Sequence, residues 1–206
     1  MQNTPVRFLM LAATLAACAP AIRVGPLGEG SSNYPSITAV DSSTPPKSMS
    51  IKLDREAWVV VLLVAPGHSA TLLYPIDSVT DNHHKAGELS LALSVPDRLT
   101  RRDTTTLRRP NTAMDTVARR QREMAFRNRD NLPMLPPDTP TYLLVITSSQ
   151  TLSFSRIVEK TVGVSIPLVE TEALNAVGKA VKSTLTQEPR EWAGYYQQVT
   201  VIPPKK

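Results

Sequence analysis

Residues 58–64, WVVVLLV, form a dense apolar run in the middle of the chain, and this run decides the fold. Seven consecutive apolar residues, most of them β-branched, are typical of a strand that is covered on both faces. The next residues, 66–68, are Pro-Gly-His, which favours a tight turn. Residues 70–74, ATLLY, then predict the returning strand of a hairpin. The chain is therefore expected to build a buried sheet around residues 58–74.

Two other strands and one helix are predicted from hydrophobic periodicity. Residues 89–94 alternate leucine with small residues, which indicates a half-buried strand. Residues 169–185 have helical spacing, with acidic residues near the start and lysines near the end, as the helix dipole prefers. The buried face of this helix is expected to hold Leu174, Val177, Val181 and Leu185. Residues 197–202 predict a last strand before two prolines.

These elements predict an α+β, β-dominated fold. We expect a sandwich or half-barrel of about five to seven strands, with one packing helix and a cationic helical insertion. Trp192, Tyr195 and Tyr196 precede the last strand. They could form a platform on which glycans stack, but aromatic residues more often fix a final strand onto a core, and we favour that interpretation.

Composition excludes several classes of protein. The 206 residues are 41% hydrophobic and 20% charged, with a net charge of +5, so a wholly disordered chain is not expected. No apolar run approaches the roughly 20 residues that a membrane-spanning helix needs, which excludes a multi-span membrane protein. A single cysteine, Cys18, excludes a fold held by disulfides.

The amino terminus has the anatomy of an export signal. Arg7 precedes an apolar run over residues 8–17, and the run ends in Leu15-Ala16-Ala17-Cys18. Here the chain resembles bacterial lipoprotein precursors. The resemblance implies that the Cys18 thiol is acylated, that residues 1–17 are removed, and that the protein is held in the membrane by its lipid. Ala19, rather than an aspartate, after the cysteine implies the periplasmic side of the outer membrane. The alternative is an ordinary signal peptide with a chance cysteine.

The predicted removal of residues 1–17 sets the first boundary of the domain organisation. Residues 18–47 comprise the lipidated cysteine and a segment rich in Pro, Gly and Ser, which we interpret as a flexible tether. Residues 48–202 form the β-rich domain, with a basic insertion at 97–131, and residues 203–206 are a tail. The alternative is that residues 34–40 add an edge strand to the domain.

Part of the domain resembles a second family, the domain of unknown function numbered 4384. The resemblance rests on the strand at 58–64, the turn at Gly67, a strand that ends in Tyr74-Pro75, the step Ala86-Gly87-Glu88, and a later strand at 142–148. It implies a β-rich accessory domain of extracytoplasmic or signalling proteins and no catalytic residues. Two features depart from the family: Ile76, where asparagine is usual, and the long basic insertion.

The insertion concentrates the charge of the chain. Residues 97–131 hold ten arginines, five acidic residues and no lysine. A helix is predicted between residues 112 and 128, with an apolar side of Met114, Val117, Ala118, Met124 and Ala125. Guanidinium groups suit bidentate pairing with phosphate or carboxylate. The candidate ligand-binding residues are Arg119, Arg120, Arg122 and Arg127.

The expected partners of these arginines follow from export. An exported protein does not meet the cytoplasmic nucleic acids that such a cluster usually binds, so no nucleic acid is expected. The available polyanions are lipid phosphates, glycolipids and wall polymers. The other interpretation, which we favour because charge runs are usually exposed faces, is a solvated helix whose arginines face water.

Catalytic motifs are missing from the sequence: it has no nucleophile elbow, metalloprotease signature, phosphate-binding glycine loop or dinucleotide fingerprint. The one conceivable metal cluster is Asp77, Asp81, His83, His84 and Glu88, but a solvated loop is the better interpretation. We therefore predict no catalytic residues, no metal and no cofactor. The predicted function is a non-catalytic, membrane-tethered binding or accessory module of the cell envelope, whose partners are another envelope protein or anionic lipids or glycans. The first alternative is a cationic factor that binds envelope polyanions through the arginine helix. A cell-envelope hydrolase is the less favoured alternative.

Overall fold

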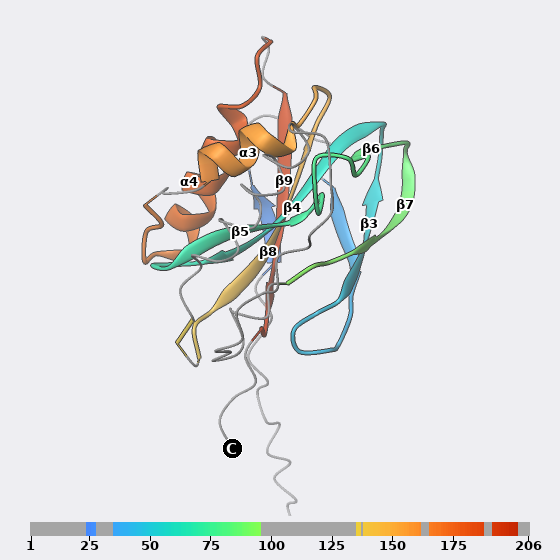
Figure 1. Cartoon of the computed structure of the whole chain (residues 1–206). Helices are drawn as coiled ribbons and strands as arrows, with labels where there is room; N and C mark the ends of the chain where they lie inside the picture. The colour runs from blue at the N-terminus through green and yellow to red at the C-terminus, as the bar shows by residue number, and fades with distance from the viewer. Residues whose placement is uncertain are drawn as a thin grey trace, which may run out of the picture.

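The fold was analysed in a computed structural model, which describes residues 24–27, 35–95, 135–136, 138–161, 165–187 and 191–201. In these ranges the chain forms a three-layered α+β domain dominated by strands. A six-stranded sheet lies in the middle, with a three-stranded sheet on one face and two helices on the other (Figure 1). The predicted β-dominated α+β fold is confirmed. The predicted signal segment, Cys18, the basic insertion and the tail at 203–206 lie outside the described residues.

The central sheet is antiparallel throughout, with the strand order β1-β9-β8-β4-β5. A short strand, β6, pairs with the start of β4. The six strands are β1 (Val24–Leu27), β4 (Ala57–Ala65), β5 (Ser69–Tyr74), β6 (His83–His84), β8 (Thr141–Ser148) and β9 (Trp192–Val199). From residue 59 to the end of β4, and along the whole of β8, every residue is buried, because these two strands are covered on both faces.

The second sheet has the order β2-β3-β7, also antiparallel. Its strands are β2 (Ser36–Val40), β3 (Ser48–Leu53) and β7 (Gly87–Ala92). Alternate side chains of β3, such as Met49 and Ile51, pack against Val59, Val61 and Leu143 of the central sheet. The two sheets therefore form the predicted sandwich.

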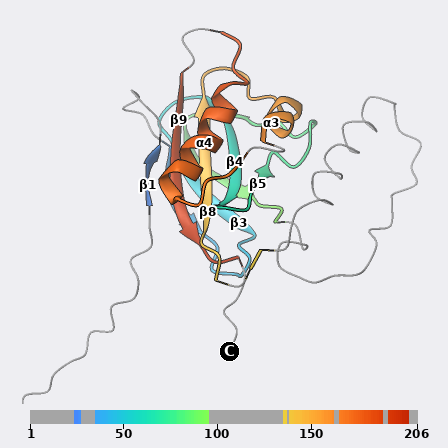
Figure 2. The same ribbon diagram turned by 90° about the vertical axis from the view of Figure 1, so that its left-hand side faces the viewer.

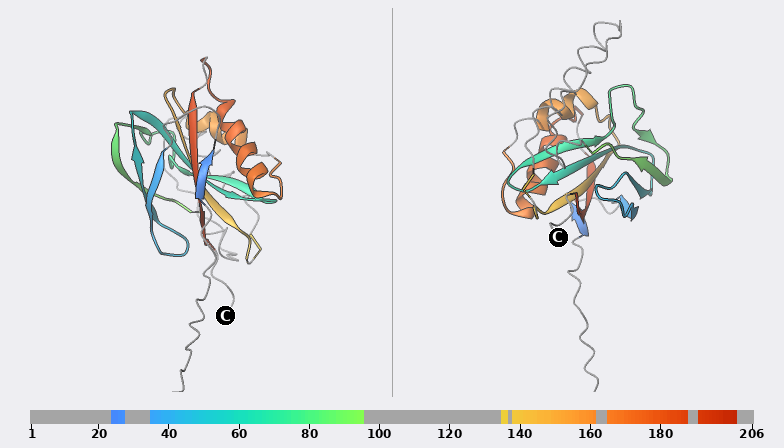
Figure 3. Two further views of the ribbon diagram at one scale, coloured as in Figure 1. Left: turned by 180° about the vertical axis from the view of Figure 1, so that it is seen from behind. Right: turned by 60° about the horizontal axis from the view of Figure 1, so that its bottom comes forward.

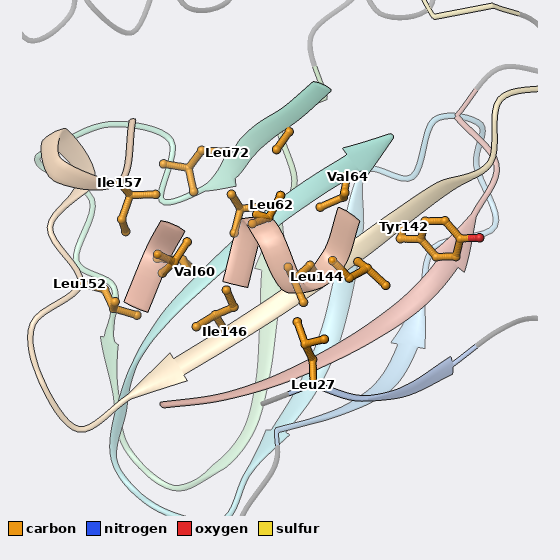
Figure 4. Close-up of a cluster of buried hydrophobic side chains, with 14 of the residues drawn as sticks. Leu27, Val60, Leu62, Val64, Leu72, Tyr142, Leu144, Ile146, Leu152 and Ile157 are labelled. Carbon is orange, nitrogen blue, oxygen red and sulfur yellow. The ribbon is translucent and has the colours of Figure 1, made fainter. Parts of the chain in front are cut away.

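The helices cover the other face of the central sheet (Figure 2). They are α3 (Phe154–Thr161) and α4 (Glu170–Lys182). Leu62 and Leu144 point from the sheet into this core, which also holds Ile157 of α3 (Figure 4). The predicted helix at 169–185 is confirmed as α4, and the four residues of its expected buried face are buried. In the part of the chain that the structure describes, no helix is long and apolar enough to span a bilayer.

Three elements differ from the sequence prediction. The described residues form two helices where one packing helix was expected, because α3, with only eight residues, is shorter than the stretch over which helical periodicity is recognised. The last strand begins at Trp192 instead of 197, so the aromatic residues lie within it. Trp192 and Tyr196 pack against the helical core, as the favoured interpretation predicted. With the short strands included, the described residues form nine strands, more than the five to seven expected.

The tether prediction for residues 18–47 is wrong for its described part. β1 and β2 lie inside that range, and β1 pairs with β9 at the edge of the central sheet (Figure 3). The alternative of an edge strand near residues 34–40 is confirmed by β2. Gly25 and Pro26, which suggested a flexible coil, suit an edge strand instead. A Cβ on Gly25 would lie 3.1 Å from Tyr196 Oη, and proline is tolerated at a sheet edge.

Candidate functional site

The two sites predicted with specific residues lie outside the described part of the chain. Cys18 precedes β1, and Arg119, Arg120, Arg122 and Arg127 fall in the insertion between the described residues 95 and 135. Both therefore stay predictions. The structure does place β1, which follows Cys18, and the segments that flank the insertion, and it places the histidine-containing loop in full.

The conceivable metal cluster is not assembled. Asp77 Oδ1 accepts hydrogen bonds from the backbone of Val79 and Thr80, at 3.1 and 2.8 Å. Asp81 Oδ1 accepts the His83 N–H at 2.9 Å, and Glu88 Oε1 accepts from Thr38 Oγ1 at 3.4 Å. Within the residues that the structure describes, no three His, Cys, Asp or Glu side chains are grouped to hold one ion.

His83 and His84 point to different neighbours. The His83 ring stacks on Trp58 with centroids 4.7 Å apart, and its Nε2 lies 3.3 Å from Glu56 Oε1 at the surface. His84 Nε2 lies 2.7 Å from the hydroxyl of buried Tyr74. These contacts turn the two imidazoles apart, so the pair acts as two separate local contacts.

The Tyr74–His84 contact is a structural hydrogen bond. The Tyr74 hydroxyl also lies 2.7 Å from the Asp81 carbonyl, which can only accept, so the hydroxyl donates there. His84 Nε2 must then carry a proton and donate to Tyr74 Oη. Burial lowers the pKa of His84, which favours the neutral ring, and burial raises the pKa of Tyr74, with a smaller contribution from the Asp81 charge. Because the hydroxyl of Tyr74 bonds to both Asp81 and His84, it holds the loop that contains these two residues in place.

The described chain enters and leaves the domain at the end of the central sheet that lies opposite the histidine-containing loop. Strand register brings four segments together at one end of the central sheet: the start of β1, the end of β9, the start of β8 and the β4–β5 turn. The pairs that show this are Val24 with Gln197, Thr141 with Val199, and Val64 with Tyr142. We call this end, with the adjoining β2–β3 loop, the exit end. The end of the sheet that carries Trp58, Ser148 and Trp192 is called the far end.

Both described flanks of the arginine-rich insertion are fixed at the exit end. The Leu93 N–H donates to the Lys47 carbonyl at 2.8 Å, just after β7. On the return, Leu135 is buried between the sheets, and Thr141 Oγ1 donates to the Val199 carbonyl at 2.6 Å. The described residues that flank the insertion on both sides therefore lie at the exit end.

A cavity of about 380 Å³ opens at the exit end between the β2–β3 loop and the end of β9. Its lining comprises Val40, Asp41, Ser42, Ser43, Thr44, Pro46, Gln197, Gln198, Val199 and Thr200. Asp41 accepts hydrogen bonds from the Ser43 hydroxyl and from the backbone of Ser43 and Lys47. The hydrogen bond from the Ser43 side chain is the main reason that the pKa of Asp41 is lowered. With a carboxylate and no basic side chain in its lining, this cavity does not suit a phosphate group.

Sequence reasoning missed two residues that shape the ends of the domain. Asp41 was placed in the tether, although Asp-Ser-Ser followed by Thr-Pro-Pro is a turn signal. Asn82 was passed over as one polar residue of a loop. It is buried and donates from Nδ2 to the carbonyls of Val59 and Leu152, at 3.2 and 3.0 Å. No signal in the sequence distinguishes it from an exposed asparagine.

No protein-family model, curated protein or solved structure matches this chain. The resemblances to lipoprotein precursors and to the domain of unknown function 4384 stay predictions.

Proposed function

We propose that the protein is a lipid-anchored, non-catalytic binding or accessory module of the bacterial cell envelope, held through Cys18 on the periplasmic side of the outer membrane. The proposal starts from Leu15-Ala16-Ala17-Cys18, from the apolar run before it, and from the position of the only cysteine. Its non-catalytic part draws on the lack of catalytic motifs in the sequence. The separate local contacts of Asp77, Asp81, His83, His84 and Glu88 support it.

The observation that carries the proposal is the early start of β1. Only residues 19–23 separate Cys18 from Val24, the first residue of the central sheet. Fully extended, this connection spans at most about 21 Å. A lipid on Cys18 would thus hold the exit end close to the bilayer, whereas a long tether would let the domain move away from it. We infer a module that works at the membrane surface.

A second function is favoured by the flanks of the insertion. Leu93 and Thr141, the described flanks, are fixed at the same end as Val24, which is the side that the lipid would bring to the bilayer. We propose that Arg119, Arg120, Arg122 and Arg127 bind anionic envelope material there, such as lipid phosphates. Each arginine near an anionic surface contributes on the order of 1 kcal/mol.

Replacing the anchor residue tests the first function. Cys18→Ser should abolish incorporation of labelled fatty acid and leave uncleaved or soluble protein in place of the lipid-labelled, membrane-associated form, because the thiol is the acylation site. Since Cys18 precedes β1, the variant should keep the unfolding midpoint of the unmodified chain, which serves as the folding control. Labelled, membrane-bound Cys18→Ser protein would contradict the proposal.

Charge removal tests the second function in the soluble Cys18→Ser chain. Changing Arg119, Arg120, Arg122 and Arg127 to Gln should abolish the binding of this chain to anionic vesicles at low salt. The chain that keeps these four arginines should bind at low salt and should bind less as the salt concentration rises. The matched control removes four exposed charges of the described domain: Lys52, Arg55, Lys85 and Arg156, each to Gln. Equal losses in both sets would show that only net charge matters and would reject a specific role for the insertion.

A further inference from the structure

Two exposed apolar side chains project from the exit end. Leu168 is 84% exposed and Val169 is 54% exposed, directly before α4. We call this pair the apolar tip. Only two other large apolar side chains of the described residues are exposed, Ile76 and Val79, and both follow β5 on the loop that leads away from the exit end. Single exposed apolar residues are ordinary, whereas adjacent ones at one end of a domain indicate a contact surface.

The tip is held in place by the β4–β5 turn. The Gly67 N–H donates to the Pro167 carbonyl at 2.8 Å. Gly67 has a φ of +75°, a backbone conformation that favours glycine, and a Cβ there would lie 2.4 Å from Leu168 Cδ2, so a larger residue would displace the leucine side chain. On the other side, the Val169 carbonyl accepts the Ala173 N–H at 2.8 Å, in the first turn of α4. The side chains therefore project from a fixed loop, and little ordering entropy opposes their burial in a partner.

The bilayer is the partner within reach. In the order β1-β9-β8-β4-β5, the β4–β5 turn lies three to four strand spacings from β1, which is about 14 to 19 Å. The connection from Cys18 to Val24 spans at most about 21 Å. A membrane that holds the lipid of Cys18 can therefore meet the tip as well. The described charges near the tip are mainly acidic: Glu170 and Glu172 lie in the first turn of α4, and Asp41 adds a carboxylate beside the exposed cation Lys47, so they give no attraction to anionic lipid.

We propose that Leu168 and Val169 enter the lipid bilayer in which Cys18 is anchored, as a second membrane contact that sets the orientation of the domain. This inference rests on the proposed lipid anchor and deepens it. The contact is apolar, so it forms on zwitterionic phosphatidylcholine and does not depend on salt. In that respect it differs from the proposed contacts of the arginines.

The experiment uses the full lipidated chain, in which Cys18 no longer offers a free thiol. Leu168→Cys gives one reactive cysteine, which is labelled with an environment-sensitive nitrobenzoxadiazole probe. Val79→Cys, 80% exposed in the unmodified chain and away from the exit end, gives the matched control. Both proteins are reconstituted into phosphatidylcholine vesicles with or without nitroxide-labelled lipid, and aqueous iodide is the opposing quencher.

We expect the probe at 168 to shift to the blue, to lose fluorescence to the nitroxide lipid, and to be protected from iodide. The probe at 79 should remain in water. Protein that floats with the vesicles but shows the same iodide quenching at both positions would overturn the tip contact and leave the anchor standing. Protection from iodide without quenching by the nitroxide lipid would assign the tip to a protein contact and also overturn the proposal. A chain that is not acylated would overturn both the anchor and the tip contact.

Discussion

The far end and the exit end of the domain are built differently. At the far end, side chains close the loops onto backbone carbonyls: Asn82 bonds to Val59 and Leu152, and Ser148 Oγ donates to the Glu191 carbonyl at 3.0 Å. At the exit end, the chain enters and leaves, a cavity of about 380 Å³ is open, and two apolar side chains project. The difference indicates that the far end stabilises the domain, whereas the exit end presents surface for binding.

A substitution in the core between the two ends should cause the largest loss of unfolding free energy. Leu62, fully buried between the central sheet and the helices, should cost about 3 kcal/mol of unfolding free energy when changed to Ala, through lost apolar burial and a cavity. Leu168→Ala, at the exposed tip, should change stability by less than about 0.5 kcal/mol. Chemical denaturation measures both. Similar values for the two variants would mean that Leu168 is part of the core.

Breaking the far end should cost somewhat less. Asn82→Ala leaves the carbonyls of Val59 and Leu152 without their amide donor, which should destabilise the domain by about 2 kcal/mol. The matched control is Asn175→Ala on the exposed face of α4, which should have no destabilising effect because alanine favours helix. Denaturation midpoints that rank the two variants equally would refute the structural role of Asn82.

Acid should weaken the two ends in different pH ranges. The pKa of His84 is lowered from its ordinary value of 6.5, mainly by burial, so the unfolded chain takes up a proton first and stability falls as the pH drops below about 6.5. The pKa of Asp41 is lowered from 3.8 by its hydrogen bonds with Ser43, so its contribution is present above that pH and is lost below it.

Variants separate the two titrations. The His84→Gln variant should lose less unfolding free energy than the unmodified protein as the pH falls below 6.5. The Asp41→Asn variant should differ from the unmodified protein only as the pH falls below 3.8. Both effects are expected to be small, because each group remains largely in contact with water. Unchanged pH profiles for both variants would show that these groups do not link acid to stability.

The centre of the domain could be predicted from the sequence because strong local patterns coincide with burial. Residues 58–64 have an unbroken apolar run, and β4 is covered on both faces. The apolar spacing at 174, 177 and 181 matches the buried side of α4. In these segments a single physical cause, the removal of apolar surface from water, determines both the sequence pattern and the structure.

The ends could not be predicted because their structure depends on distant partners. Gly25 and Pro26 of β1 suggest a coil until Tyr196 and the free edge of β9 are known. Asn82 matters only because Val59 and Leu152 present carbonyls to it. The exposed position of Leu168 depends on Gly67, far away in the chain. Contacts of this kind leave no periodic trace in the sequence.

The distance between the exit end and the bilayer tests the central claim most directly. In the lipidated chain, Lys47→Cys at the exit end and Lys85→Cys, at the opposite end of the three-stranded sheet, each accept one donor dye, and energy transfer is measured to acceptor lipids at the bilayer surface. Strand β3, six residues long, separates the two positions by about 20 Å along the three-stranded sheet. We predict much stronger transfer from position 47 than from position 85. Equal transfer from both positions, as a domain tumbling on a long tether would give, would contradict the account.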